Sequence, residues 1–124
     1  NESDVVIGLA ASGNTKFTEE ILKIASKKGA LTVAISNNPN GSILKQAKVK
    51  IILDTKQEVI AGSTRLKAGT AQKVCLNLIS SMVMIMMGKV KDGQMINMVS
   101  NNKKLKDRKF RIEAYFNKKY SYNE

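Results

Sequence analysis

The sequence has no histidine, no tryptophan, one cysteine and one proline in 124 residues. Without histidine, imidazole acid–base chemistry and histidine metal sites are excluded, and a lone cysteine can form neither a zinc cluster nor an internal disulfide. Cys75 lies in an apolar run and is expected to be buried and unreactive, which fits a reducing, cytoplasmic compartment. Any catalysis would depend on carboxylate, lysine, tyrosine or hydroxyl groups, and no metal site is expected.

Long hydrophobic runs are also scarce. The most apolar stretch, residues 74–87, is interrupted by Asn77, Ser80 and Ser81. It is shorter than the ~20 apolar residues that a membrane-spanning helix needs, so it predicts a buried helix. No basic segment followed by an apolar stretch opens the chain, so we expect no signal peptide and no membrane partner.

Acidic residues are few, with 10 Asp and Glu against 21 Lys and Arg and a formal net charge of +11. This balance favours anionic partners, which include nucleic acid, membrane surfaces and phosphorylated metabolites. The densest basic group lies within residues 103–119. No nucleic-acid-reading motif accompanies it, so we interpret it as a solvated helix face and expect no nucleic-acid partner.

Apolar runs and helical periodicity alternate along the first half of the chain. They predict strands at residues 4–11, 31–36 and 49–53, a helix between the first two that ends before Gly29, and a short helix from Ser42, its expected cap, to Ala47. Strands that alternate with helices through short links predict an α/β fold with a parallel, doubly wound sheet and flanking helices.

The second half of the chain is less regular. A long helix is predicted from about Ala68 to Met87, and its apolar circumference indicates burial inside a subunit or between subunits. A short strand at residues 94–99 and a basic helix from residue 102 to about 117 follow. We expect one partial domain over residues 1–110 and a basic tail or helix end over residues 111–124.

Two loops carry the polar groups that suggest a function. Residues 11–15 join a buried strand to a helix, where backbone N–H groups attract anions such as phosphate. Gly13 permits close approach, while Ser12, Asn14 and Thr15 offer uncharged donors. The alternative is an ordinary strand–helix turn with a capping residue.

The second loop, residues 58–73, follows the third strand and should reach the same carboxyl edge of the sheet. It contains Glu58, the hydroxyls of Ser63 and Thr64, and the cations of Arg65 and Lys67, which suit phosphate contacts. The alternative is that Ser63 caps a helix and the cations are solvated.

Several segments together resemble one protein family, the N-acetylmuramic acid 6-phosphate etherases. They are residues 4–13, 35–40, 62–73, 86–90 and 102–105. The resemblance covers roughly residues 4–110, and its uninterrupted run from Ser63 to Lys73 is long enough to be specific.

The resemblance implies part of the sugar isomerase (SIS) fold, which binds phosphosugars, usually as a dimer. Members are lyases that release D-lactate from N-acetylmuramic acid 6-phosphate without a metal or organic cofactor, in cell-wall sugar recycling. The family's catalytic glutamates lie upstream of the segment matching residues 4–13, so no residue here is expected to be catalytic. Substrate binding is expected from Ser12, Gly13, Asn14, Thr15, Glu58, Ser63, Thr64 and Lys67.

Two functions therefore remain open from the sequence. The first is a fragment of an etherase, completed by a complementing chain or by a homodimer partner. The second is a non-catalytic phosphosugar-binding regulatory module, because SIS domains also occur in regulators.

Overall fold

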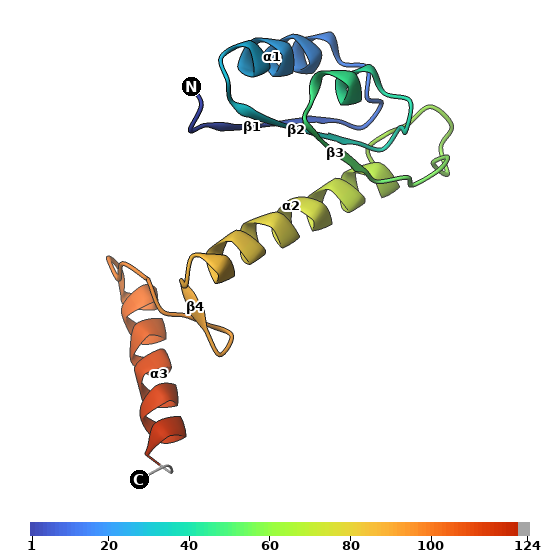
Figure 1. Ribbon diagram of the computed structural model, residues 1–124. Coiled ribbons are helices and arrows are strands. Elements are labelled where there is room, and N and C mark those ends of the chain that lie inside the picture. Colours follow the sequence, from blue (N-terminus) through green and yellow to red (C-terminus); the bar gives the residue numbers. More distant parts are fainter. Residues whose placement is uncertain (122–124) are drawn as a thin grey trace. The chain divides into compact units, whose positions relative to one another are not determined.

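The computed structural model describes residues 1–121 (Figure 1). It divides into two compact units, residues 1–76 and residues 77–124.

The first unit contains a three-stranded parallel sheet. Its strands are β1 (Val5–Ala10), β2 (Leu31–Ser36) and β3 (Val49–Ile52), in the order β1-β2-β3. The central strand pairs with both neighbours, so that Val33 lies between Ile7 and Val49. The predicted parallel α/β core is therefore confirmed, with strand ends within one residue of those expected.

Helix α1 (Lys16–Lys27) and the 3-10 helix η1 (Ser42–Gln46) form the two crossovers. They pack against each other and against the sheet, on the same side of it in Figure 1. Between them and the sheet lies the hydrophobic core, built around Leu22, Ile43 and Ala34, which are fully buried. Consecutive right-handed crossovers that advance in one direction place their helices on one face.

The prediction that Ser42 caps the second helix is wrong. Gly41 is the N-cap residue, and Ser42 is the first residue of the 3-10 helix. Its hydroxyl instead donates a hydrogen bond of 2.7 Å to Glu19 on α1. The physical reason is tertiary, because α1 lies close enough to offer a carboxylate to that hydroxyl.

The other face of the sheet is apolar and largely open within residues 1–76. Strand alternation places branched aliphatic side chains there, namely Val5, Ile7, Leu9, Leu31, Val33, Ile35, Val49 and Ile51. Ile35 is fully buried, but Val5, Ile7, Leu31 and Val49 remain 38–58% exposed. The sequence of these strands is thus typical of a sheet covered on both faces, as the apolar runs suggested.

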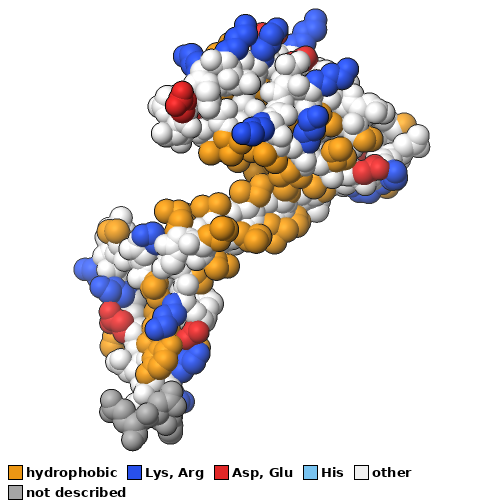
Figure 2. All heavy atoms as spheres, viewed as in Figure 1, with side chains coloured by type: hydrophobic (Ala, Val, Ile, Leu, Met, Phe, Trp, Pro, Cys, Tyr) orange, Lys and Arg blue, Asp and Glu red, His pale blue; other side chains and the backbone are white. Residues whose placement is uncertain are grey.

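Helix α2 (Lys67–Met86) is the predicted long helix, and its predicted burial inside a subunit or between subunits stays a prediction. It buries only Ala68, and Cys75 is half-exposed rather than buried. Hydrophobic side chains are visible along it in Figure 2. Because these side chains surround most of the helix, one small sheet offers too little surface to cover them. None of the helices within residues 1–121 has the length and apolarity needed to cross a membrane.

The second unit contains a β-hairpin and a helix. Strands β4 (Val90–Lys91) and β5 (Gln94–Met95) are antiparallel, and helix α3 spans Lys103–Tyr120. Asp92 and Gly93 both have positive φ, 50° and 72°, as a two-residue type I′ turn requires. The predicted strand at residues 94–99 is therefore confirmed for its first two residues only.

The predicted basic helix is confirmed. Its N-cap is Asn102, whose side chain accepts a 2.9 Å hydrogen bond from the backbone N–H of Leu105. Residues 111–120 form the second half of this helix and Ser121 is its C-cap, whereas residues 122–124 of the predicted tail lie outside the described residues. The domain boundary at residue 110 stays a prediction.

Candidate functional site

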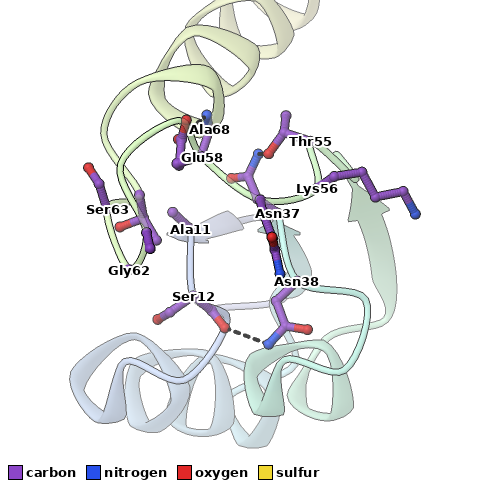
Figure 3. Close-up of a pocket in the computed structure, with 13 residues that line it drawn as sticks. Ala11, Ser12, Asn37, Asn38, Thr55, Lys56, Glu58, Gly62, Ser63 and Ala68 are labelled. Atoms are coloured by element: carbon purple, nitrogen blue, oxygen red, sulfur yellow. Dashed lines mark hydrogen bonds between the residues drawn. The ribbon is translucent and has the colours of Figure 1, made fainter.

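The candidate site lies where the three parallel strands end. The chain leaves β1 at Ala11, β2 at Asn37 and the β3 region at Thr55, and these segments border a single cavity of about 310 Å³ (Figure 3). The cavity is lined by Ala11, Ser12, Asn37, Asn38, Thr55, Lys56, Gln57, Glu58, Ala61, Gly62, Ser63, Thr64 and Ala68. Ligands of open parallel sheets bind at this carboxyl edge.

Ser12 and Ser63 both line the cavity, although they are 51 positions apart in the sequence. The prediction that their loops share one edge of the sheet is therefore confirmed. Thr64 and Glu58 line the same cavity, so the structure brings together four of the predicted site residues.

Two other residues of the first loop, Gly13 and Asn14, hold the loop against η1 rather than lining the cavity. Gly13 is buried with φ 74°, and its carbonyl accepts a 3.0 Å hydrogen bond from the backbone N–H of Ile43. The side chain of Asn14 accepts a 3.0 Å hydrogen bond from the backbone N–H of Ser42. Thr15 is the N-cap of α1 but forms no side-chain capping bond. These three residues do not line the cavity, and their role in substrate binding stays a prediction.

Two asparagines that were not among the predicted site residues, Asn37 and Asn38, also line the cavity. Asn38 donates a 3.0 Å hydrogen bond to the main-chain oxygen of Ser12, which ties the loops after β1 and β2 together (Figure 3). Asn37 donates to the carbonyl of Leu53 at 3.0 Å and accepts from Gln72 of α2 at 2.9 Å. The signal was available, because both asparagines follow a predicted parallel strand.

Glu58 clamps the start of α2. Its two carboxylate oxygens accept hydrogen bonds from the backbone N–H groups of Lys67, at 2.9 Å, and Ala68, at 3.0 Å. These bonds satisfy donors that the first turn of a helix leaves free. The Ala68 N–H is the main reason that the pKa of Glu58 lies below its usual value, and the N–H groups of Lys67 and Leu66 act in the same direction.

This clamp has a consequence for anion binding. Free N–H groups at a helix start attract anions, but a carboxylate of the chain itself already occupies the start of α2. The donors left to a ligand on this side are the hydroxyls of Ser63 and Thr64. The Arg65 and Lys67 side chains do not line the cavity and border a separate hollow on α2.

Uncharged donors therefore dominate the cavity. Its charged residues are Lys56 and Glu58, and Lys56 forms an ion pair with Asp54 while its side chain extends away from the other labelled residues in Figure 3. Among the described residues Glu58 is the one carboxylate at the cavity, whereas acid–base pairs commonly use two carboxylates with separated pKa values. Within residues 1–121, no group of His, Cys, Asp and Glu residues could hold a metal ion.

This α/β unit has, at the carboxyl edge of its parallel sheet, a cavity lined in part by hydroxyl and amide side chains. The SIS domain model matches residues 1–85, and the chain belongs to that family.

The relatives of this chain point to one kind of SIS protein, the N-acetylmuramic acid 6-phosphate etherases. The chain is 54% identical over 111 residues to the N-acetylmuramic acid 6-phosphate etherase of Oceanobacillus iheyensis and 51% identical over 112 residues to that of Bacillus mycoides. Each alignment covers 90% of this chain and 38% of the relative, so the chain spans under half the length of these etherases. The similarity to etherases predicted from the sequence is confirmed.

The fold is shared with a solved structure of lower identity. That structure, titled "Crystal structure of an hypothetical protein", superposes with a TM-score of 0.58 at 19% identity. The superposition covers 82% of this chain and 59% of that one. At this identity it supports the fold alone.

Proposed function

We propose that this chain is the phosphosugar-binding part of an N-acetylmuramic acid 6-phosphate etherase. The observation that carries the proposal is the meeting of Ser12, Ser63 and Thr64 at one cavity on the carboxyl edge of a SIS-family sheet. The similarity to etherases over 90% of the chain supports the choice of substrate.

The cavity suits a phosphate monoester attached to a sugar. Hydroxyl and amide groups from four segments can donate to phosphate oxygens, and a sugar hydroxyl can use the remaining N–H of the Asn38 amide. The pairing of Asn38 with the Ser12 carbonyl fixes the distance between two of these segments before any ligand binds. Such preorganisation lowers the entropy lost on binding.

The same geometry supports binding without turnover. Cleavage of the D-lactyl ether needs a base to remove the proton beside the sugar carbonyl and an acid to assist the departure of lactate. Glu58 is the only carboxylate that lines the cavity among residues 1–121, and it is held by the helix start. We therefore propose that the acid and base belong to a part of the protein outside this chain, in the same subunit or a complementing one, in the cytoplasm.

Binding is tested by calorimetric titration of the 124-residue chain with N-acetylglucosamine 6-phosphate and with N-acetylglucosamine. We expect the phosphorylated sugar to bind more tightly, and Ser12→Ala or Ser63→Ala to weaken it about 5- to 10-fold, as for loss of one hydrogen bond. Ser26→Ala, an exposed serine on α1, is the matched control. Equal affinity for the two sugars would contradict the proposal.

Catalysis is tested by D-lactate release from N-acetylmuramic acid 6-phosphate. We expect no release by the chain alone and release after addition of the complementing segment of an etherase relative. Turnover by the chain alone that Glu58→Gln abolishes would make Glu58 a catalytic residue.

Because Glu58 is the one carboxylate at the cavity among residues 1–121, a second function is also supported, that of a non-catalytic phosphosugar-binding regulatory module. Its signature would be phosphosugar binding that persists while the complemented protein still releases no D-lactate.

Partner contact is part of the proposal, because α2 leaves most of its apolar side chains exposed. We expect light scattering to show a dimer or a larger species in dilute solution. A stable monomer would contradict this part of the proposal.

A further inference from the structure

The hairpin and α3 of the second unit are held together by polar and cation–π contacts. Asp92, in the hairpin turn, accepts hydrogen bonds from Lys119 at 2.9 Å and from the Tyr120 hydroxyl at 3.1 Å. The ammonium group of Lys91 lies 4.8 Å from the centre of the Tyr120 ring and 5.6 Å from that of Phe116. These contacts hold strand β4 and the hairpin turn against the helix.

Beside these contacts lies a hollow of about 580 Å³, which we call the arginine hollow. It is lined by Gly93, Gln94, Met95, Arg108, Arg111, Ile112 and Tyr115. Four of these side chains carry hydrogen-bond donors, namely two guanidinium groups, one amide and one phenol. Among the described residues, no acidic side chain lines it.

The two arginines are not neutralised within residues 1–121. Of the nearby acids, Asp92 pairs with Lys119 and Glu113 with Lys109. Asp107 directly precedes Arg108, but among the described residues neither Arg108 nor Arg111 forms an ion pair with it or with another acid. Arg111 has only a long bond, in which its Nε donates to the main-chain oxygen of Asp107 at 3.4 Å. Residues 77–124 carry ten Lys and Arg against four Asp and Glu, a net charge of +6, so the surroundings attract anions as well.

The arrangement of donors indicates the shape of the ligand. Arg108 and Arg111 are three positions apart on a helix and therefore lie on one face, each with a planar fork that binds two oxygens. Gln94 and Tyr115 add donors from the hairpin and from the next helical turn. A tetrahedral phosphate has more acceptor oxygens than a carboxylate and can use more of these donors.

We propose that the arginine hollow is a second anion site, which binds the phosphate group of a small ligand through Arg108 and Arg111. The site is separate from the cavity at the sheet edge, because the two share no lining residue. The sequence predicted that the basic face of α3 is solvated. In this proposal, part of that face binds phosphate.

The test is a two-dimensional NMR titration of the 124-residue chain with inorganic phosphate at constant ionic strength, with chloride as the balancing ion. We expect saturable shifts at the Gln94 amide and at the Arg108 and Arg111 Nε–H signals. Shifts near Ser12 and Ser63 report binding at the sheet-edge cavity separately, so one experiment distinguishes the two sites.

Three variants make the outcome decisive. Arg108→Gln with Arg111→Gln should weaken phosphate binding at the hollow about 10-fold or more, whereas Lys103→Gln with Lys104→Gln removes the same charge from α3 and should change it less than about 2-fold. Arg108→Lys with Arg111→Lys, which keeps the charge but not the forks, should fall between them. Equal losses in the two glutamine variants, shifts spread over every lysine of α3, or equal binding of acetate would overturn the proposal.

Discussion

Gly13 provides a sharp test of how the loops at the candidate site are packed. Its φ is 74°, and a Cβ atom placed on it would lie 2.5 Å from the Cα of Gly41 and 2.6 Å from the hydroxyl oxygen of Ser36. The first of these neighbours is backbone and cannot rotate away. Gly13→Ala should therefore force apart the loops that follow β1 and β2.

The cost has two parts. An alanine in the left-handed region costs about 1–2 kcal/mol. Relief of the overpacking between the two backbones adds about 1–3 kcal/mol. The expected total is about 2–5 kcal/mol, a large fraction of the roughly 5–15 kcal/mol that stabilises an ordinary domain.

Gly62→Ala is the matched control, because Gly62 also has a positive φ, 77°, but has nothing within 4 Å of its added Cβ. It should cost only the conformational part, about 1–2 kcal/mol. The measurement is urea unfolding of each variant followed by circular dichroism and extrapolated to water. If the two substitutions destabilise the chain equally, the loops do not meet as closely as the structure shows, and the steric reasoning is refuted.

Three further predictions concern other elements. Gly69→Ala should stabilise the chain by roughly 0.5–1 kcal/mol in urea unfolding, because Gly69 is helical with open space around it; destabilisation would mean a hidden contact. Thr32→Val should cost about 1–3 kcal/mol, since the buried Thr32 hydroxyl accepts a 3.1 Å hydrogen bond from the Lys48 N–H; an unchanged urea midpoint would contradict this. The lowered pKa of Glu58 means that its clamp contributes fully above the usual value of 4.5 and is lost as pH falls through the lower folded value. The Ala68 amide NMR signal should therefore titrate below pH 4.5 in the native chain and not in Glu58→Gln.

The fold was predictable where local patterning and topology agree. Continuous apolar runs and short connections identified three parallel strands, and the crossover rule then placed Ser12 and Ser63 at the same edge. The type I′ hairpin could also have been predicted, since Asp92-Gly93 is a strong signal for such a turn. It was overlooked because its strands are only two residues long.

The details of the site were not predictable in the same way. A Ser/Gly/Asn/Thr loop suggests four ligand-binding residues, but it does not show that Gly13 and Asn14 also accept hydrogen bonds from the start of η1. Nothing in the local sequence shows that Glu58 bonds to an N–H group ten positions later. Such contacts depend on where segments distant in the chain come to lie.

The sequence by itself determined the parallel sheet, the helix positions, the excess of positive charge and the similarity to etherases, because these depend on periodicity, composition and residue identity. Only the tertiary structure decided which donors face the cavity, that Glu58 occupies the start of α2, and that Arg108 and Arg111 share a hollow with Gln94. It also decided which apolar faces stay open. Periodicity shows that a face is apolar, whereas burial requires a second surface at the right place, and that is a property of the folded chain.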